Sequence, residues 1–335
     1  MPTIHGDKLT RLEFLARVGR VEQAGGLRRV QLTEGPGAGV EVIEVNTGEF
    51  TFELLPSRGL DIGACAFQGR SIAWQSPAGV VAPGLAHRDP GGFERAFGGG
   101  LLTTCGLQNV GLPSLEAGIQ HSQHGRASET PAEHVAAWGE WTDDEYLFNI
   151  RGVTREASLH EAKLQKTRIV RARLGEARLE VIDVVQNVGG APVETMFLYH
   201  LNFGWPLVAP GSRLDLHSKR ITAVEGRPEG WEEMLAPQAD WAPVVLDHDI
   251  TPDADGWARF SLSGAGMKVR VGYDAKTLPR FTQWRQFGVA DYVLGLEPGS
   301  TGVRGRAGER AIKPLPTLKP GESVTYRLEL TVQPD

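Results

Sequence analysis

The sequence is poor in cysteine and lysine and has no long apolar run. Its two cysteines, Cys65 and Cys105, cannot build a disulfide framework, and the N-terminal stretch "MPTIHGDKLTRLEF" lacks the apolar core of a signal peptide. A membrane-spanning helix needs about 18 or more consecutive apolar residues, and the sequence contains no such run. We therefore expect a globular protein of the cytoplasm.

A surplus of positive charge is also missing. The formal net charge is -6 at pH 7, and only eight of the 35 basic residues are lysines. Nucleic acids and anionic membranes attract a concentrated positive surface, so neither is expected as a partner. A small ligand that is neutral or locally anionic fits this charge balance better. Nothing in the sequence indicates an oligomeric state.

The short motifs of several large enzyme classes are absent. The sequence contains no G-x-S-x-G elbow, no G-x-x-x-x-G-K-[ST] loop, no C-x-x-C pair and no H-E-x-x-H. Interpretations as a serine hydrolase, a P-loop protein or a zinc protease therefore have no motif to support them. The "GPGAG" at residues 35–39 lacks the spacing of a dinucleotide-binding loop and predicts a hairpin turn.

Regular alternation of apolar and polar residues is the main structural signal. In "SVTYRLELTV", residues 323–332, the apolar side chains fall on one face and the polar ones on the other, and "ARLEVIDVVQN", residues 177–187, repeats the pattern. Many such runs, separated by 42 glycines and 21 prolines, predict an all-β protein built as a large antiparallel β-sandwich. We expect one domain over residues 1–335, with residues 1–40 packing onto the sandwich.

Two segments are expected to differ from this pattern. Residues 6–19, "GDKLTRLEFLARVG", have helical spacing, with Asp7 as a candidate N-cap. The glycine-rich residues 93–113, "FERAFGGGLLTTCGLQNVGLP", predict long irregular loops, which is where β-scaffolds usually build ligand sites.

Three histidines lie within "HSQHGRASETPAEH", residues 121–134. Two histidines three apart are a poor chelating pair on a strand, so a metal site is disfavoured. His121 and His134 are as readily explained as surface or core residues. His124 differs, because Gly125 lets the backbone bend and Arg126 brings a guanidinium close to the same ligand.

His200 and Asn202 interrupt the apolar strand "MFLYHLNFGWPL", residues 196–207. A histidine in this position is either a core residue with satisfied hydrogen bonds or a proton donor that titrates near neutral pH. The residues themselves leave both interpretations open.

Glu297 ends the apolar strand "DYVLGLEPG", residues 291–299. Apolar surroundings raise the proton affinity of a carboxylate and would make Glu297 a general base near neutral pH. The alternative is a structural ion pair with Arg304 or Arg306.

Two further segments supply candidate ligand contacts. Arg58 lies in "LLPSRGLDIG", residues 54–63, where it is either a ligand contact or a surface residue of a turn. Trp284 and Arg285 lie in "TQWRQFG", residues 282–288. An indole stacks well on the apolar face of a sugar ring, although a tryptophan in the core is the more common use.

Taken in order, "PSRGLDI", "GGLLTTCGLQNVG", "HGR", "LYHLNFGWP" and "GLEP" give the sequence a family resemblance. It resembles the galactose mutarotase-like, or aldose 1-epimerase, superfamily, and within it a branch described as a domain of unknown function. The resemblance covers roughly residues 40–333. It implies the galactose mutarotase-like supersandwich with few short helices, an open cleft on one sheet, a small-molecule carbohydrate as ligand, and a mechanism without metal or organic cofactor.

The resemblance also implies roles for individual residues. Glu297 takes the place of the base that removes the proton from the anomeric hydroxyl, and His200 that of the acid that protonates the ring oxygen. His124 would hold the ring oxygen or a neighbouring hydroxyl. Arg58 or Arg126 would take the role of the superfamily's arginine. Asn202, Trp284 and Arg285 complete the expected substrate contacts.

The sequence departs from the characterised mutarotases at two points. Tyr199 precedes His200 where they have an asparagine, and their sugar-binding aspartate has no clear match, since nothing local selects Asp240 over Asp247. Galactose is therefore not assumed as the substrate. The arginines at positions 58, 95, 126 and 285 would also suit an acidic or phosphorylated sugar.

Three functions follow from these observations. The main expectation is an aldose 1-epimerase acting on a free sugar or sugar derivative. The second is a non-catalytic carbohydrate-binding or regulatory protein, which would have no need for a matched acid and base. The third is a different sugar isomerase or a lyase on the same scaffold, in which the pair would move a proton at carbon.

Overall fold

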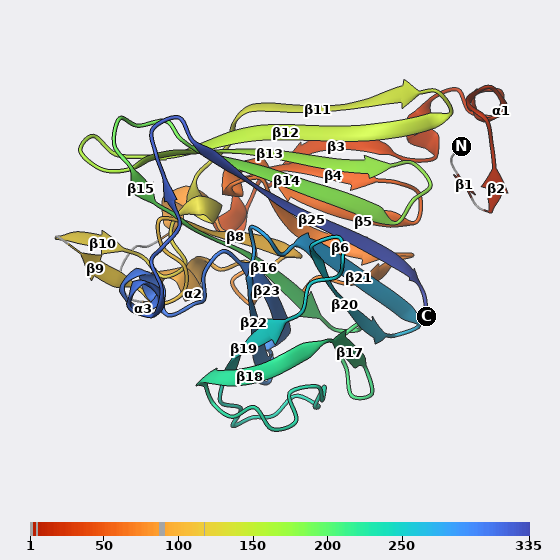
Figure 1. The fold of residues 1–335 in the computed structure, drawn as a ribbon. Coiled ribbons are helices and arrows are strands. Elements are labelled where there is room, and N and C mark those ends of the chain that lie inside the picture. Colours follow the sequence, from red (N-terminus) through yellow and green to blue (C-terminus); the bar gives the residue numbers. More distant parts are fainter. Residues whose placement is uncertain (1–2, 5, 87–90, 117) are drawn as a thin grey trace.

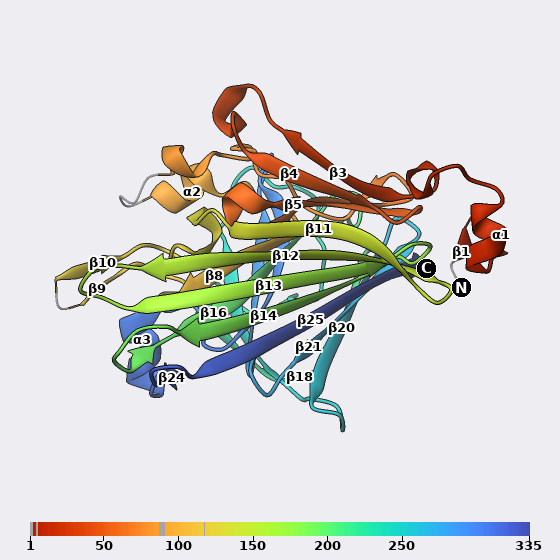
Figure 2. The same cartoon turned by 90° about the horizontal axis from the view of Figure 1, so that it is seen from above.

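The fold consists of two large antiparallel sheets. The computed structural model describes residues 3–4, 6–86, 91–116 and 118–335. One sheet has eight strands and the other has eleven. Figure 1 shows β11 to β14 and β25 of the first sheet side by side, and Figure 2 shows the same layer from above. The expected antiparallel sandwich with few short helices is confirmed.

The 8-stranded sheet has, in spatial order, β11 (Glu133–Thr142), β12 (Glu145–Ala157), β13 (Lys163–Arg173), β14 (Arg178–Asn187), β25 (Ser323–Pro334), β21 (Met267–Asp274), β20 (Trp257–Gly264) and β17 (Arg213–Leu216). The 11-stranded sheet has the order β18 (Ser218–Glu225), β19 (Val244–Ile250), β22 (Arg280–Phe287), β23 (Tyr292–Gly299), β16 (Met196–Gly204), β8 (Leu102–Leu107), β6 (Asp61–Phe67), β5 (Phe50–Leu55), β4 (Glu41–Asn46) and β3 (Gly26–Gln31), with β7 (Arg70–Ser71) beside β6.

The remaining elements are short. Three two-stranded pairs are β1 (Thr3–Ile4) with β2 (Asp7–Lys8), β9 (Ser114–Glu116) with β10 (Ile119–His121), and β15 (Val193–Glu194) with β24 (Thr317–Leu318). The helices are α1 (Arg11–Leu15), α2 (Gly92–Ala96), α3 (Gly305–Ile312) and the 3-10 turns η1 (Val21–Gln23), η2 (Gly35–Gly37), η3 (Pro56–Arg58), η4 (Pro83–Leu85) and η5 (Ala127–Glu129). Within the described residues, no helix is long and apolar enough to cross a membrane.

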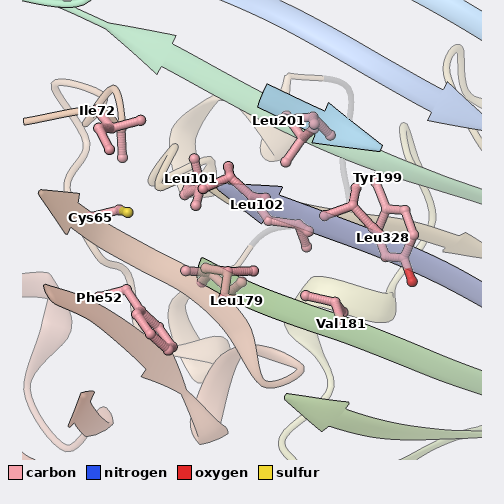
Figure 3. Close-up of a cluster of buried hydrophobic side chains, with 14 of the residues drawn as sticks. Phe52, Cys65, Ile72, Leu101, Leu102, Leu179, Val181, Tyr199, Leu201 and Leu328 are labelled. Atoms are coloured by element: carbon pink, nitrogen blue, oxygen red, sulfur yellow. The ribbon is translucent and has the colours of Figure 1, made fainter. Parts of the chain in front are cut away.

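The alternating segments form strands as predicted, and their apolar faces meet between the sheets. In β25, Tyr326, Leu328 and Leu330 are buried while Arg327 is exposed. Figure 3 shows the resulting core, to which both sheets contribute. The labelled side chains are Phe52, Cys65, Ile72, Leu101, Leu102, Tyr199 and Leu201 from the 11-stranded sheet and its loops, and Leu179, Val181 and Leu328 from the 8-stranded sheet.

Charged groups also lie between the sheets, in a hydrogen-bonded network around Arg168 of β13. Arg168 donates to both carboxylate oxygens of Asp183, at 2.9 Å from Nε to Oδ1 and 2.7 Å from Nη2 to Oδ2. It also donates to Asp61 on β6 and to Thr104 on β8, and Tyr199 on β16 donates to Asp183 Oδ2 at 2.7 Å. Because a buried charge is costly unless it is paired and hydrogen-bonded, this network links β13 and β14 firmly to the three central strands opposite them.

The structure corrects two expectations. The helix predicted over residues 6–19 covers only Arg11–Leu15, because Thr10 provides the N-cap in a capping box with Glu13, while Asp7 lies in β2. Residues 93–113 are not only loops. They contain most of α2 and all of β8, a strand that is buried at every position and therefore shows no alternation.

The turn predicted at "GPGAG" is present, and the N-terminal segment contributes to the core and to one sheet. Residues 35–39 connect β3 to β4, which pair as an antiparallel hairpin. Phe14 of α1 is buried in the core cluster shared by the two sheets, and β3 extends the 11-stranded sheet at its edge.

Candidate active site

His200 and Glu297 face each other on neighbouring strands of the 11-stranded sheet. Leu201 of β16 pairs with Leu296 of β23, so the preceding and following residues of the two antiparallel strands are also opposite each other. The distance from His200 Nε2 to Glu297 Oε1 is 3.2 Å. Both side chains are buried, with 4% and 3% of their residues' surface exposed. The sheet register therefore creates the contact that the two separate motifs could not reveal.

Burial shifts the two pKa values in opposite directions. It raises the pKa of Glu297 well above its ordinary value of 4.5, and the charge of Asp247 raises it further. Burial, together with the nearby His124, lowers the pKa of His200 to about 3, although the side chain of Asn202 opposes that shift. Both shifts favour the neutral form of each group, a protonated carboxyl beside a neutral imidazole, so the pair as a whole carries one exchangeable proton.

Glu297 does not form the structural ion pair with Arg304 or Arg306 that was the alternative to a catalytic role. Arg304 binds Asp247, with 2.6 Å between Nη1 and Oδ2, and also contacts Glu309. Arg306 binds Glu116 and Glu194. Both arginines form ion pairs with other carboxylates, and the residue in contact with Glu297 is His200.

His124 is brought to the same place by a tight turn. His124 and Gly125 both have left-handed backbones, with φ of 54° and 74°. A Cβ atom on Gly125 would lie 2.3 Å from the carbonyl oxygen of Gly106 in the adjacent strand, so only glycine fits there. Backbone bonds from Gly106 N to His124 O and from Arg126 N to Gly106 O, both 2.9 Å, fasten the turn to β8.

The His124 ring lies 5.5 Å from the His200 ring, measured between centroids, and burial lowers the His124 pKa to about 4. Its Nδ1 accepts a long hydrogen bond, 3.4 Å, from the backbone N–H of Gly111. The neutral ring therefore carries its proton on Nε2, from which it can donate to a ligand.

Aromatic side chains surround the pair. The Trp284 ring lies 5.5 Å from the His200 ring, and that of Phe97 lies 5.2 Å from it. Phe93 stacks on Phe97, and Trp74 packs against Trp284 at 6.3 Å. Of these, only Trp284 was expected, because Phe97 lies in the segment predicted as loop and Trp74 lies in a segment without regular periodicity.

Asn202 and Arg58 are buried next to this cluster. Asn202 lies on the same face of β16 as His200 and donates to the carbonyl oxygens of Gly100 and His200, while its Oδ1 has no partner among the described residues. Arg58 donates from Nη2 to the carbonyl oxygen of Ala96, next to Phe97.

The structure does not bring the side chain of Arg126 into contact with the His200 cluster within the described residues. Its backbone holds the turn at His124, and its side chain lines a small cavity of about 30 Å³ with Gln108, His121 and Glu156. A role of Arg126 in ligand binding stays a prediction.

The structure places Arg285, a predicted substrate contact, away from the His200–Glu297 pair. Neighbouring residues of a strand point to opposite faces, so Arg285 faces away from the side on which Trp284 contacts His200. Its Nη2 donates to the carbonyl oxygen of Glu233 at 2.8 Å, and its guanidinium packs against the rings of Trp241 and Phe287.

Asp247, rather than Asp240, lies in the same cross-strand row of residues as Glu297. Asp247 of β19 is opposite Thr282 of β22, which is opposite Glu297. Its carboxylate accepts from Thr282 Oγ1 at 3.3 Å and from Arg280 Nη2 at 3.1 Å, in addition to Arg304. Asp240 is exposed in a loop. The choice depends on pairing across three strands, which the local sequence does not encode.

Metal ligands and cavity size are two further criteria for locating a site in the described part of the molecule. Among the described residues, no three His, Cys, Asp or Glu side chains are grouped so that they could hold a metal ion. A groove of about 860 Å³ over β17, β20 and β21 is larger than the cavity of about 130 Å³ that Phe97 and Thr103 line, but Arg259 in it is paired with Asp253. Size alone therefore does not identify the site.

Comparison with known proteins agrees with this architecture. The model of the family described as "Domain of unknown function (DUF4432)" matches residues 37–332. No curated protein gives a significant match. A solved structure from Klebsiella pneumoniae, described as a putative aldose 1-epimerase, has 24% sequence identity and a TM-score of 0.88, and the match covers 92% of this chain and 83% of that chain.

Two more distant structures have the same fold. A galactose mutarotase-like protein from Clostridium acetobutylicum is 12% identical, with a TM-score of 0.65 over 93% of this chain and 100% of that chain. A galactose 1-epimerase from Lactobacillus acidophilus is 11% identical, with a TM-score of 0.57 over 92% of this chain and 99% of that chain. At these identities the likeness shows the fold, and the resemblance inferred from the ordered motifs is confirmed at that level.

The turn at Gly125 gives a first prediction. Gly125→Ala should lower the free energy of unfolding by about 1–3 kcal/mol, because alanine is strained at positive φ and its Cβ would collide with Gly106. The matched control is Gly190→Ala, at a glycine whose added Cβ has no neighbour within 4 Å. Chemical denaturation of both variants measures the difference. Equal stability of the two would contradict the account of the turn.

The raised pKa of Glu297 gives a second prediction, about stability. As pH rises above 4.5, unfolded chains lose the Glu297 proton while folded chains keep it, so this group makes the fold progressively less stable. Glu297→Gln removes the titration and keeps the size. Its free energy of unfolding should exceed that of the unaltered protein by an amount that grows between pH 4.5 and neutrality.

Urea denaturation across this pH range provides the measurement, and Glu34→Gln, at an exposed position, is the control that should show no such trend. A Glu297→Gln protein that loses stability relative to the unaltered protein as pH rises would mean that the carboxylate form is favoured in the fold.

Proposed function

The chain belongs to the DUF4432 family and has the galactose mutarotase-like fold, and from this premise we propose that it is an aldose 1-epimerase, which interconverts the anomers of a free sugar or sugar derivative. The observation that carries the proposal is the 3.2 Å contact between His200 Nε2 and Glu297 Oε1 in a buried, aromatic-lined site. The opposite pKa shifts favour the neutral form of each group, so the carboxylate and imidazolium that open the ring form by transfer of the shared proton from Glu297 to His200 across this contact.

The chemistry requires an acid and a base at one carbon atom. In a cyclic aldose the anomeric hydroxyl and the ring oxygen are both bonded to C1, so the two groups that serve them must lie close together. Glu297 as carboxylate takes the proton of the anomeric hydroxyl, and His200 as imidazolium gives a proton to the ring oxygen. The bond between C1 and the ring oxygen breaks, and the anomeric oxygen becomes the carbonyl oxygen of the open-chain aldehyde.

Ring closure uses the same two groups in exchanged roles. After rotation about the C1–C2 bond, neutral His200 accepts the proton of the attacking hydroxyl, and protonated Glu297 returns a proton to the carbonyl oxygen. Each cycle restores the starting state, with no net gain or loss of protons. The carboxylate with imidazolium and the carboxylic acid with neutral imidazole contain the same number of protons, so a pair that holds one proton is suited to both half-reactions.

Neighbouring residues supply the substrate contacts. His124 donates from Nε2 to the ring oxygen or to an adjacent hydroxyl, and the Asn202 Oδ1 accepts from a hydroxyl. Trp284 offers its ring to the apolar face of the sugar, beside His200. A protein that only binds carbohydrate would have little use for two buried titratable groups, because burying them lowers stability without improving hydrogen bonding to a neutral sugar.

The proposal predicts a measurable acceleration of anomer exchange. Two-dimensional NMR exchange spectroscopy on a panel of neutral, deoxy, acidic and phosphorylated aldoses should show it for at least one class. Glu297→Gln and His200→Ala should each slow the exchange by roughly a hundred- to ten-thousandfold, the range expected for loss of a general acid or base. The controls Glu34→Gln and His217→Ala, both at exposed positions, should leave the rate unchanged.

If sugars of the panel bind but none shows accelerated anomer exchange, the proposal is wrong and a carbohydrate sensor is favoured instead. The same experiment in deuterated water identifies the remaining alternative. Mutarotation exchanges only hydroxyl protons, so deuterium appearing at carbon would indicate an isomerase or lyase that moves a proton at carbon.

A further inference from the structure

A cavity of about 130 Å³ adjoins the His200–Glu297 site. It shares two residues with the surroundings of the pair: Phe97, whose ring contacts His200, and Thr103 of β8, which is directly opposite His200 in the sheet. Arg58, Gly99 and Gln75 also line it. A group attached to a ligand at the acid–base pair can therefore extend into this cavity.

The cavity contains a buried guanidinium that the described residues do not fully satisfy. Arg58 is 7% exposed, and only its Nη2 has a described hydrogen bond, 3.1 Å to the carbonyl oxygen of Ala96. Its Nη1 is buried and has no partner among the described residues. Burial lowers the pKa of Arg58, a sign that its positive charge is poorly compensated. Such a group gains most from an anion that reaches it.

No carboxylate among the described residues hydrogen-bonds to Nη1 of Arg58. Asp61 accepts from Arg168 and Thr104 on the interior side of the sheet, and together with Glu129 it offsets the Arg58 charge only through space. Glu53 accepts the backbone N–H of Ala64 at 3.3 Å, and burial raises its pKa, which makes the neutral form of Glu53 easier to reach beside a bound anion.

The order of the strands tells which part of a sugar would enter. In the 11-stranded sheet, β23 with Glu297 lies on one side of β16, which carries His200. On the other side lies β8, whose Thr103 lines the cavity, followed by β6. In the proposed reaction Glu297 serves the anomeric oxygen and His200 serves the ring oxygen. Continuing past the ring oxygen, away from C1, the next ring atom is C5 in a hexopyranose. The substituent on C5 is thus directed toward Arg58.

We propose that the substrate is an aldose whose C5 arm carries an anionic group, a carboxylate or a phosphate, bound by Arg58 in this cavity. The inference rests on the proposed function for the orientation of the sugar. Arg58 then acts as a specificity-determining residue that contacts the part of the substrate remote from the reacting bond.

The test compares matched sugars on matched variants. The probes are glucose, glucuronic acid and glucose 6-phosphate, with their galactose counterparts, and the readout is kcat/KM for anomer exchange by NMR. In the unaltered protein one anionic class should exceed its neutral counterpart by roughly ten- to a hundredfold, the worth of a charge-assisted hydrogen bond. Arg58→Gln should abolish that preference and Arg58→Lys should retain part of it. Arg20→Gln, at a side chain that is 82% exposed, should preserve it fully.

Binding is measured separately in the Glu297→Gln background, as the rise in melting temperature on addition of each sugar. This readout does not need catalysis. The rise caused by the anionic sugar should disappear in the Glu297→Gln, Arg58→Gln double variant, and the comparison of carboxylate with phosphate decides which anion the cavity takes.

The outcomes separate this inference from the proposed function. Exchange that is equally fast for neutral and anionic sugars, or an anionic preference that survives Arg58→Gln, would overturn the inference and leave the epimerase standing. Stabilisation by an anionic sugar that depends on Arg58, without exchange of any sugar, would support the anion site and reject the epimerase. Neither binding of anionic sugars nor exchange would reject both.

Discussion

The hydrogen bond from Tyr199 to Asp183 determines which face of β16 carries the candidate catalytic residues. Tyr199 points into the sandwich, where Asp183 is held by Arg168, and the next residue, His200, must then point to the opposite face. A slip of one residue would bury the imidazole in the interior and expel the phenol, so the interior network excludes that register. The position of the site thus depends on charges that take no part in its chemistry.

The opposite face combines elements from distant parts of the chain. β23 supplies Glu297, β22 supplies Trp284, and the turn fastened to β8 supplies His124. The protein holds these groups on paired strands and on a turn whose glycine touches the neighbouring backbone, rather than on free loops. Such a scaffold keeps the acid and the base at hydrogen-bond distance while their burial disfavours the charged form of each. The same burial reduces stability, which is a common feature of active sites.

The sequence predicts part of this arrangement and conceals the rest. Alternation in β14 and β25 identified the antiparallel sandwich, because each of these strands has one face in the core. β8 was not predicted, because it is buried on both faces and so lacks the alternation of apolar and polar residues. The glycines before and within it also favoured a loop. Thr10 rather than Asp7 caps the first helix, a difference of three residues that propensity alone does not resolve.

The structure brings together three of the residues that the sequence singled out for the candidate site. His200, Glu297 and Trp284 could be selected from the sequence because polar or aromatic residues stand out in short strands, and the family resemblance linked them. Strand alternation could have separated Arg285 from Trp284, since adjacent residues point to opposite faces. The alignment of Asp247 with Glu297 could not have been found, because it depends on the pairing of three strands.

The central claim is that His200 and Glu297 work as a pair that holds one proton, and the pH dependence of kcat/KM for anomer exchange tests it most directly. Protonation of both groups requires a pH near 3, the lowered pKa of His200, and loss of the shared proton requires a pH well above 4.5, because the pKa of Glu297 is raised. The account predicts a rate constant that stays level between these limits and falls only when the pair gains or loses a proton. A rate that instead rises through the ordinary pKa of a histidine, 6.5, or through that of a glutamate, 4.5, would show that the two groups titrate independently and would contradict the account.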